Sequence, residues 1–107
     1  MQQISASQLA EWLNDPHRTP PSLIDVREPD EFAYCHIPGA INMPLSDFMR
    51  HAESLDQDAT LVMICHHGMR SYQAGAWLER QGFDEVINLS GGVEAWSVTV
   101  DPTMPRY

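Results

Sequence analysis

The stretch LVMICHHGMRS, from Leu61 to Ser71, decides the fold and organises the rest of the chain. Its first four residues, 61–64, form a short apolar run of the kind that becomes a buried β-strand. A tight loop of residues 65–70 follows, and a helical pattern begins at Ser71. Cys65 therefore lies between a strand and a helix, where unpaired backbone N–H groups and the positive end of the helix dipole meet. Both favour a thiolate over a thiol, so the pattern predicts a nucleophilic cysteine.

The other loop residues suit the binding of an anion next to this cysteine. Arg70 ends the loop with a permanent positive charge and a fork of N–H donors. Gly68 allows a turn in which a larger side chain would block inward-facing N–H groups. Such N–H groups form a nest for one negative charge. We therefore expect Cys65 to be catalytic and the remaining loop residues to bind substrate: His66, His67, Gly68, Met69, Arg70 and Ser71.

Short strand patterns alternate with helical patterns along the whole chain. This alternation predicts an α/β fold in which a mostly parallel sheet of about five strands carries helices on both faces. Sites in such sheets form at the carboxyl ends of the strands, so the loop at 65–70 and the polar residues 25–31 are expected at the same edge. We expect strands over 23–26, 40–43, 61–64 and 86–89, and helices that begin near Ser5, Pro29, Ser46, Ser71 and Gly92. Leu45, Phe48, Ala52 and Leu55 are expected on the buried side of the helix that Ser46 caps, and residues 101–107 are expected to be irregular.

Composition bounds the function. A chain of 107 residues is one small domain, and fifteen acidic residues against six arginines and no lysine give a net charge of −9. A surface this acidic repels nucleic acid and anionic membranes, so neither is an expected partner, and an anionic substrate must be captured locally. No apolar run approaches the roughly 20 residues of a membrane span. The first residues lack the layout of a secretory signal, so we expect a cytoplasmic protein, and we expect a monomer.

Three motifs resemble those of rhodanese-like sulfurtransferase domains: DVREPDEF at 25–32 with HIPGAINMPL at 36–45, CHHGMRS at 65–71, and LSGGVEAW at 89–96. They occur in the family's order and cover nearly the whole chain, so 1–107 is identified as a single rhodanese-like domain. The resemblance implies a persulfide on Cys65. It also implies a sulfur donor, either a small anion such as thiosulfate or a persulfide, and an acceptor. The acceptor is cyanide in vitro and a thiol or a sulfur-carrier protein in the cell.

Two other functions compete with sulfur transfer. Related domains with phosphatase or arsenate reductase activity resemble this fold but use a C-x5-R loop, whereas residues 65–70 are C-x4-R, and the shorter loop favours sulfur. Non-catalytic binding modules of the same family usually lack the loop cysteine, which this chain has.

Asp25, Arg27 and Glu31 follow the second strand pattern and are expected to support the site from behind the loop. Their simplest role is to form ion pairs that hold the strand end and the next helix. The family analogy makes Glu31 the acid that orients Arg70, whereas Arg27 is expected to be structural.

His66 and His67 are possible zinc ligands by type. Adjacent residues on a tight loop rarely converge on one ion, so we expect no metal and no cofactor. Their rings are expected at the mouth of the pocket, where a protonated ring would favour the Cys65 thiolate further.

Two further features have competing interpretations. Cys35 is either a small buried residue or a resolving thiol for Cys65, and the buried residue is favoured. The tail VDPTMPRY, which includes Tyr107, looks similar to the ends of rhodanese domains fused to adenylyltransferases that pass sulfur to carrier proteins. Its simpler interpretation is a segment that packs over the edge of the sheet with Tyr107 buried.

Overall fold

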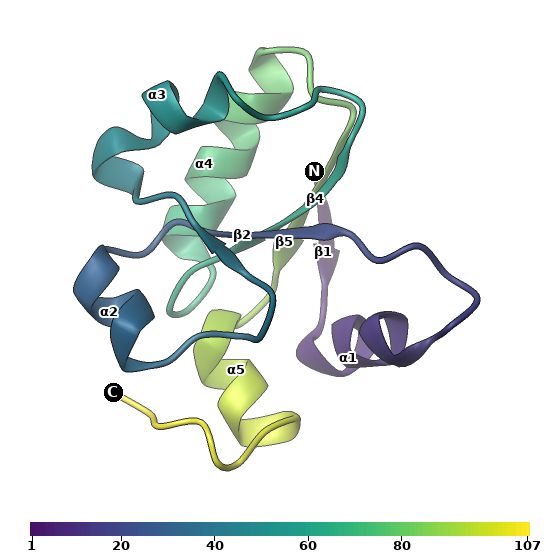
Figure 1. Ribbon diagram of the computed structural model, residues 1–107, viewed down its shortest axis with the longest axis vertical. Helices are drawn as coiled ribbons and strands as arrows, with labels where there is room; N and C mark the ends of the chain where they lie inside the picture. The colour runs from purple at the N-terminus through teal and green to yellow at the C-terminus, as the bar shows by residue number, and fades with distance from the viewer.

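A five-stranded parallel sheet forms the centre of the computed structural model, which describes residues 1–107. The strand order is β1-β5-β4-β2-β3, and every pairing is parallel (Figure 1). The predicted α/β fold with helices on both faces is confirmed. The strands are β1 (Gln2–Ile4), β2 (Ser22–Asp25), β3 (Ile41–Asn42), β4 (Thr60–Ile64) and β5 (Glu85–Leu89).

Helices cover both faces of the sheet and leave its carboxyl edge to the loops. They are α1 (Ala6–Asn14), α2 (Pro29–Tyr34), the short 3-10 turn η1 (Leu45–Asp47), α3 (Phe48–Ala52), α4 (Met69–Arg80) and α5 (Gly92–Thr99). Buried side chains of α1 and α5 share one hydrophobic cluster, and those of α3 and α4 share another. None of these helices combines the length and the apolar character that crossing a membrane requires.

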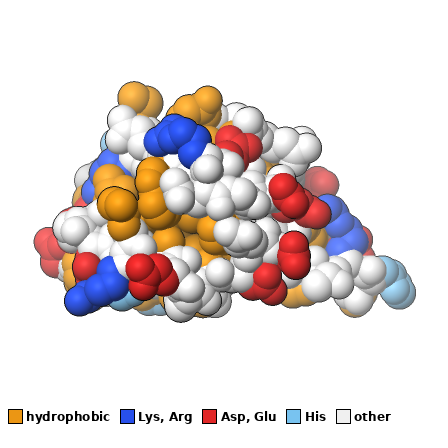
Figure 2. Space-filling model, turned by 90° about the horizontal axis from the view of Figure 1, so that it is seen from above, with side chains coloured by type: hydrophobic (Ala, Val, Ile, Leu, Met, Phe, Trp, Pro, Cys, Tyr) orange, Lys and Arg blue, Asp and Glu red, His pale blue; other side chains and the backbone are white.

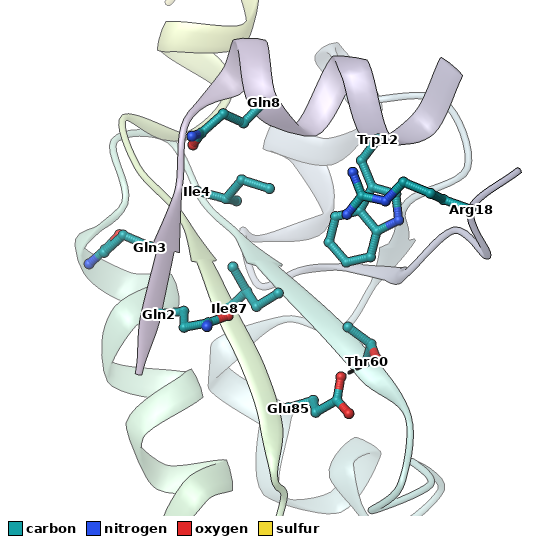
Figure 3. Close-up of a pocket in the computed structure, with 9 residues that line it drawn as sticks. All are labelled: Gln2, Gln3, Ile4, Gln8, Trp12, Arg18, Thr60, Glu85 and Ile87. Atoms are coloured by element: carbon teal, nitrogen blue, oxygen red, sulfur yellow. Dashed lines mark hydrogen bonds between the residues drawn. The ribbon is translucent and has the colours of Figure 1, made fainter. Parts of the chain in front are cut away.

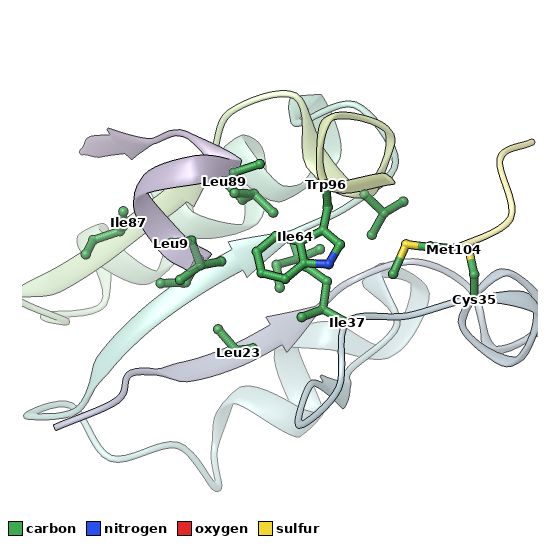
Figure 4. Close-up of a cluster of buried hydrophobic side chains, with 12 residues drawn as sticks. Leu9, Leu23, Cys35, Ile37, Ile64, Ile87, Leu89, Trp96 and Met104 are labelled. Carbon is green, nitrogen blue, oxygen red and sulfur yellow. The ribbon is translucent and has the colours of Figure 1, made fainter. Parts of the chain in front are cut away.

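The central strand β4 supplies both clusters. Val62 and Ile64 belong to the cluster under α1 and α5, while Leu61 and Met63 belong to the other. All four side chains are fully buried, as the apolar run predicts. Figure 4 shows the first cluster, to which β4 contributes Ile64 and α5 contributes Trp96. Alternate residues of a strand point to opposite faces of the sheet. The strand that precedes the loop at 65–70 is therefore packed against hydrophobic side chains on both of its faces.

Two predictions about local structure were incomplete or wrong. The strand β1 was not predicted, because Gln2-Gln3-Ile4 is polar and carries no apolar run. It forms because its backbone pairs with β5 at the edge of the sheet. Ser46 was expected to cap a helix, but its hydroxyl donates to Glu28 at 3.2 Å and the helix begins only at Phe48. Leu45, expected on a buried face, is 36% exposed.

Other local signals agree with the structure. Ser5 and Gln8 form a reciprocal capping box at the start of α1, with contacts of 3.0 and 3.1 Å. Gly82 follows α4 with a positive φ of 99°, as expected at the end of a helix. The segment 101–107 contains no helix or strand.

The amino end of α5 lies directly against the loop at 65–70. The N–H groups of Val93 and Glu94 donate to the carbonyl oxygens of Cys65 and His66 at 2.9 and 3.1 Å. Gly92 makes this approach possible: its φ is +58°, and a Cβ there would overlap both carbonyl oxygens. These contacts give a structural reason for the second glycine of LSGGVEAW, Gly92.

We predict that Gly92→Ala lowers the free energy of unfolding by roughly 2–4 kcal/mol, because it adds a backbone clash to an unfavourable φ. Urea denaturation followed by circular dichroism measures the loss. Gly39→Ala is the matched control: Gly39 has a φ of +88° but no atom within 4 Å of the added carbon. Equal losses in the two variants would contradict the proposed close contact.

Candidate active site

Cys65 lies immediately after β4 and is only 1% exposed. One backbone N–H of the loop, that of Gly68, donates to its Sγ at 3.0 Å. Gly68 has a φ of +103° and precedes α4, so its left-handed backbone turns this N–H toward the sulfur. The predicted position of the cysteine between a buried strand and a helix is therefore present, with a backbone donor at the sulfur.

A buried polar network supports the sulfur from the sheet. The hydroxyl of Ser71, which is fully buried, lies 3.3 Å from Sγ of Cys65 and 2.6 Å from Oδ1 of Asn88. A hydroxyl has one proton, so it donates to one of these acceptors at a time, and the Asn88 contact is the shorter. The amide of Asn88 in turn donates to the carbonyl of Gly68 and to Gln3, both at 3.0 Å.

Neither Asn88 nor Gln3 was predicted from the sequence as a residue of the site. Asn88 is a polar residue in the apolar strand pattern 86–89, and that break in the pattern was the available signal. Gln3 belongs to β1, which was not predicted. Together they tie the loop to the two strands β5 and β1.

Arg70 forms a two-pronged ion pair with Glu31 from α2. The two nitrogen-to-oxygen distances are 2.8 and 3.0 Å. The hydrogen bonds that Arg70 donates are the main reason that the pKa of Glu31 falls to about 2, and the same bonds to the Glu31 carboxylate raise the pKa of Arg70. The side chain of Arg70 remains 37% exposed, so it can also meet a ligand from solvent.

Asp25 and Arg27 form a second ion pair, and this one is completely buried. The guanidinium contacts both Asp25 oxygens, at 2.7 to 3.1 Å, and donates to the Cys35 carbonyl at 2.6 Å. Burial works to lower the pKa of Arg27, but the hydrogen bonds that its guanidinium donates to Asp25 and Tyr107 outweigh burial, and the pKa is raised. The pair links β2 to the end of α2, which is the structural arrangement expected for Arg27.

The rings of His66 and His67 stack with their centroids 3.9 Å apart. Burial is the main cause that lowers the pKa of His66, followed by the charge of His67. His66 is therefore neutral near pH 7, and the expectation that a protonated ring helps the thiolate does not hold for it. Met69, which was also expected to bind substrate, is 74% exposed.

Glu94 joins the two histidines in space. Ligand atoms of His66, His67 and Glu94 lie within 4.8 Å of one another, a grouping that the sequence did not reveal. The two rings are stacked, with their planes inclined by 28°. Glu94 is also engaged by Arg106, at 2.7 Å from Nε. The grouping therefore consists of a stacked histidine pair and a carboxylate that is paired with an arginine.

Tyr107 was expected to be buried at the edge of the sheet, and this was wrong. The tail follows α5 and ends beside α2, as the yellow segment of Figure 1 shows. Tyr107 is 45% exposed and stacks on His66, with centroids 3.9 Å apart and planes 9° apart. Its hydroxyl contacts Arg27 and Glu31. The sequence gives no spacing rule that would bring residue 107 to residues 27, 31 and 66.

The two cysteines are free and lie in different clusters. Cys35 is 7% exposed and packs in the cluster with Trp96 and Met104 (Figure 4). Its Sγ is 3.8 Å from a nitrogen of Arg27. Cys35 thus has a packing role in the structure, whereas its role as a resolving thiol stays a hypothesis.

The largest hollow of the surface, about 570 Å³, lies away from the cysteine loop. Figure 3 shows it beside α1 and the whole of β1, near the first residues of β4 and β5, where Trp12 lies under Arg18 and Thr60 donates to Glu85. Sites in parallel sheets form at the carboxyl ends of the strands, where Cys65 lies. A smaller hollow of about 300 Å³ borders the loop itself, between Gly68, Tyr72 and Asn88.

Figure 2 shows another face, seen from above the view of Figure 1. Hydrophobic side chains gather in one area there, acidic side chains are spread across the face, and the basic ones stand apart from one another. The face therefore has no continuous basic surface, in keeping with the net charge of −9.

A family model, curated relatives and solved structures all point to the same protein family. The family model described as "Rhodanese-like domain" matches residues 5–99. The chain is 45% identical over 80 residues to the thiosulfate sulfurtransferase GlpE of Ectopseudomonas mendocina, which covers 72% of this chain and 71% of that protein. It is 40% identical over 89 residues to the rhodanese-like/PpiC domain-containing protein 12 of Arabidopsis thaliana, but this covers only 30% of the plant protein and 79% of this chain.

A solved structure of a rhodanese-like domain protein from Staphylococcus aureus superposes with a TM-score of 0.84 at 26% identity. The match covers 100% of this chain and 99% of that one. The fold, the position of the cysteine loop and these matches lead to one conclusion: the chain belongs to the rhodanese-like domain family.

Proposed function

We propose that this protein is a sulfurtransferase that moves sulfane sulfur from a donor such as thiosulfate to a thiophilic acceptor through a persulfide on Cys65. The observation that carries the proposal is the loop cysteine after the central strand, with the Gly68 N–H at its sulfur and Arg70 at the end of the loop. Family membership and relatives named thiosulfate sulfurtransferase support sulfur transfer as the reaction class.

The proposed first step is an attack of the Cys65 thiolate on the outer sulfur of the donor. A bond forms between Sγ and that sulfur, the sulfur–sulfur bond of thiosulfate breaks, and its electron pair leaves with sulfite. The Gly68 N–H, directed at Sγ, stabilises negative charge on the sulfur. No proton transfer is needed if the cysteine is already a thiolate.

The second step returns the enzyme to its starting state. Cyanide or an acceptor thiolate attacks the outer sulfur of the persulfide and leaves with it, and the electron pair of the broken bond returns to Sγ. In the first step the Sγ anion of Cys65 is the nucleophile, and in the second step it is the leaving group. A hydrogen bond from the Gly68 N–H to Sγ therefore stabilises this anion in both half-reactions.

Arg70 is proposed to pair with the anionic donor and with the sulfite that leaves. Glu31 occupies two of its donor groups and fixes the plane of the guanidinium. The remaining N–H groups of Arg70 are then available to a dianion at the loop. In a protein with a net charge of −9, this local contact must replace long-range attraction.

We predict that Cys65→Ser abolishes the gain of one sulfur atom when reduced protein is incubated briefly with thiosulfate. Intact-mass spectrometry measures the gain, and cyanide should remove it from the wild type. The variant should stay folded because the substitution is nearly isosteric. Cys35→Ser is the control and should gain sulfur normally. Activity on phenyl phosphate esters without any response to thiosulfate would instead support the phosphatase alternative.

We predict that Arg70→Ala raises KM for thiosulfate about tenfold or more and changes kcat little, because a charge-assisted contact to the bound anion is lost. Steady-state kinetics with cyanide as acceptor separate the two constants. Arg50→Ala is the matched control, since Arg50 is an exposed arginine that pairs with Asp47 away from the loop. A fall in kcat alone would mean that Arg70 acts on the transition state.

The lowered pKa of Glu31 predicts a pH-dependent contribution to stability. Folding lowers this pKa from 4.5 to about 2, so the contribution is complete above pH 4.5 and is lost as the pH falls toward 2. The difference in free energy of unfolding between wild type and Glu31→Gln, measured with urea, should be constant from about pH 5 to 8 and shrink below pH 4.5. A difference that stays constant in acid would show that the ion pair does not form.

A further inference from the structure

Tyr107 lies where three parts of the site meet. Its hydroxyl is 2.9 Å from NH1 of Arg27 and 2.9 Å from Oε2 of Glu31. It therefore touches both ion pairs behind the loop, the buried one of Asp25 and the half-exposed one of Arg70. Arg27 also donates directly to the backbone carbonyl of Glu31 at 3.3 Å, but only Tyr107 bonds to the Glu31 carboxylate and to Arg27 from outside the two pairs.

The direction of these hydrogen bonds is fixed by chemistry. A guanidinium only donates, so the hydroxyl oxygen accepts from Arg27. The single proton of the hydroxyl is then left for the carboxylate of Glu31. Burial raises the pKa of Tyr107, which keeps this proton in place at neutral pH. The result is a continuous series of contacts from Asp25 through Arg27, Tyr107 and Glu31 to Arg70.

The ring of Tyr107 adds a second, independent contact with the loop. It stacks almost parallel on His66, the residue after Cys65, with centroids 3.9 Å apart. Tyr34 from α2 meets it edge-on, at 5.8 Å and 84°. Yet Tyr107 is 45% exposed, so its contribution to the hydrophobic core is small. Its contacts go to the site and not to the interior.

We propose that Tyr107 is a positioning residue for the anion-binding Arg70. It holds Glu31 between two donors, its own hydroxyl and the guanidinium of Arg70, so that Arg70 keeps the orientation in which its free N–H groups face an anion at Cys65. This inference rests on the proposed function for its role in sulfur transfer. The positioning of Arg70 itself does not depend on which anion the loop uses.

The test compares two reagents that alkylate Cys65, the anion iodoacetate and neutral iodoacetamide. The ratio of their rate constants reports how well the site receives a negative charge. A general loss of order in the loop would make Cys65 more accessible to both reagents, so both rate constants would change together and their ratio would stay the same. Peptide mapping assigns the modification to Cys65 and excludes Cys35.

We predict that Tyr107→Phe, which keeps the stacked ring, lowers this ratio about three- to tenfold, as the loss of one charge-assisted hydrogen bond implies. Arg70→Ala should lower it as well, and Tyr107→Phe should add less than about twofold in that background, because both changes act through one contact series. Tyr34→Phe is the matched control. It removes a hydroxyl without a hydrogen bond and should leave the ratio unchanged.

An unaltered ratio in Tyr107→Phe would overturn the proposal, and so would a full additional loss in the double variant. Where thiosulfate loads the wild type, KM for thiosulfate should rise by a similar factor in Tyr107→Phe with kcat retained. If the wild type gains no sulfur at all, the proposed function fails, while the alkylation ratio still decides the role of Tyr107.

Discussion

Two hydrogen bonds from the amino end of α5 hold the cysteine loop in place. The first free N–H groups of a helix need acceptors, and those of Val93 and Glu94 find them in the carbonyl oxygens of Cys65 and His66. Because these carbonyls point toward α5, the loop can turn its Gly68 N–H toward the sulfur. The geometry of the cysteine thus depends on a backbone approach that only glycine at position 92 permits.

Charge around the site is arranged in alternating signs. A fully buried Asp25–Arg27 pair is costly to desolvate, and it is stabilised by the further hydrogen bonds that the guanidinium makes. Glu31 lies between two positive side chains, with the Tyr107 hydroxyl connecting it to Arg27. Of the two arginines in this series, Arg27 is fully buried and Arg70, at the outer end, is open to solvent. This series of charges therefore presents one positive side chain, that of Arg70, at the cysteine loop of a strongly acidic protein.

Much of the architecture could be predicted from sequence. The apolar run 61–64, the helix that begins near Ser5 and the alternation of strand and helix patterns depend on local sequence, so periodicity and the types of residue at helix ends reveal them. Cys65 and Arg70 are only five positions apart, so their presence in one loop could also be predicted from the sequence. The contributions of Gln3, Asn88, Glu94 and Tyr107 arise from pairing of distant segments. A polar edge strand, a single amide in an apolar strand and an irregular tail carry no local signal of the partners that they meet.

The near-complete burial of Cys65 affects how deep a sulfur donor and a sulfur acceptor must each enter the protein. A donor must deliver its sulfur along a narrow approach, so the atom that it transfers stays on the solvent side of Sγ. A sulfur–sulfur bond is about 2 Å long, and the loaded enzyme would therefore present its reactive atom about that much nearer to the surface. In the proposed cycle, the donor has to enter further than the acceptor does. Loading then selects for slender molecules, and unloading is open to bulkier ones.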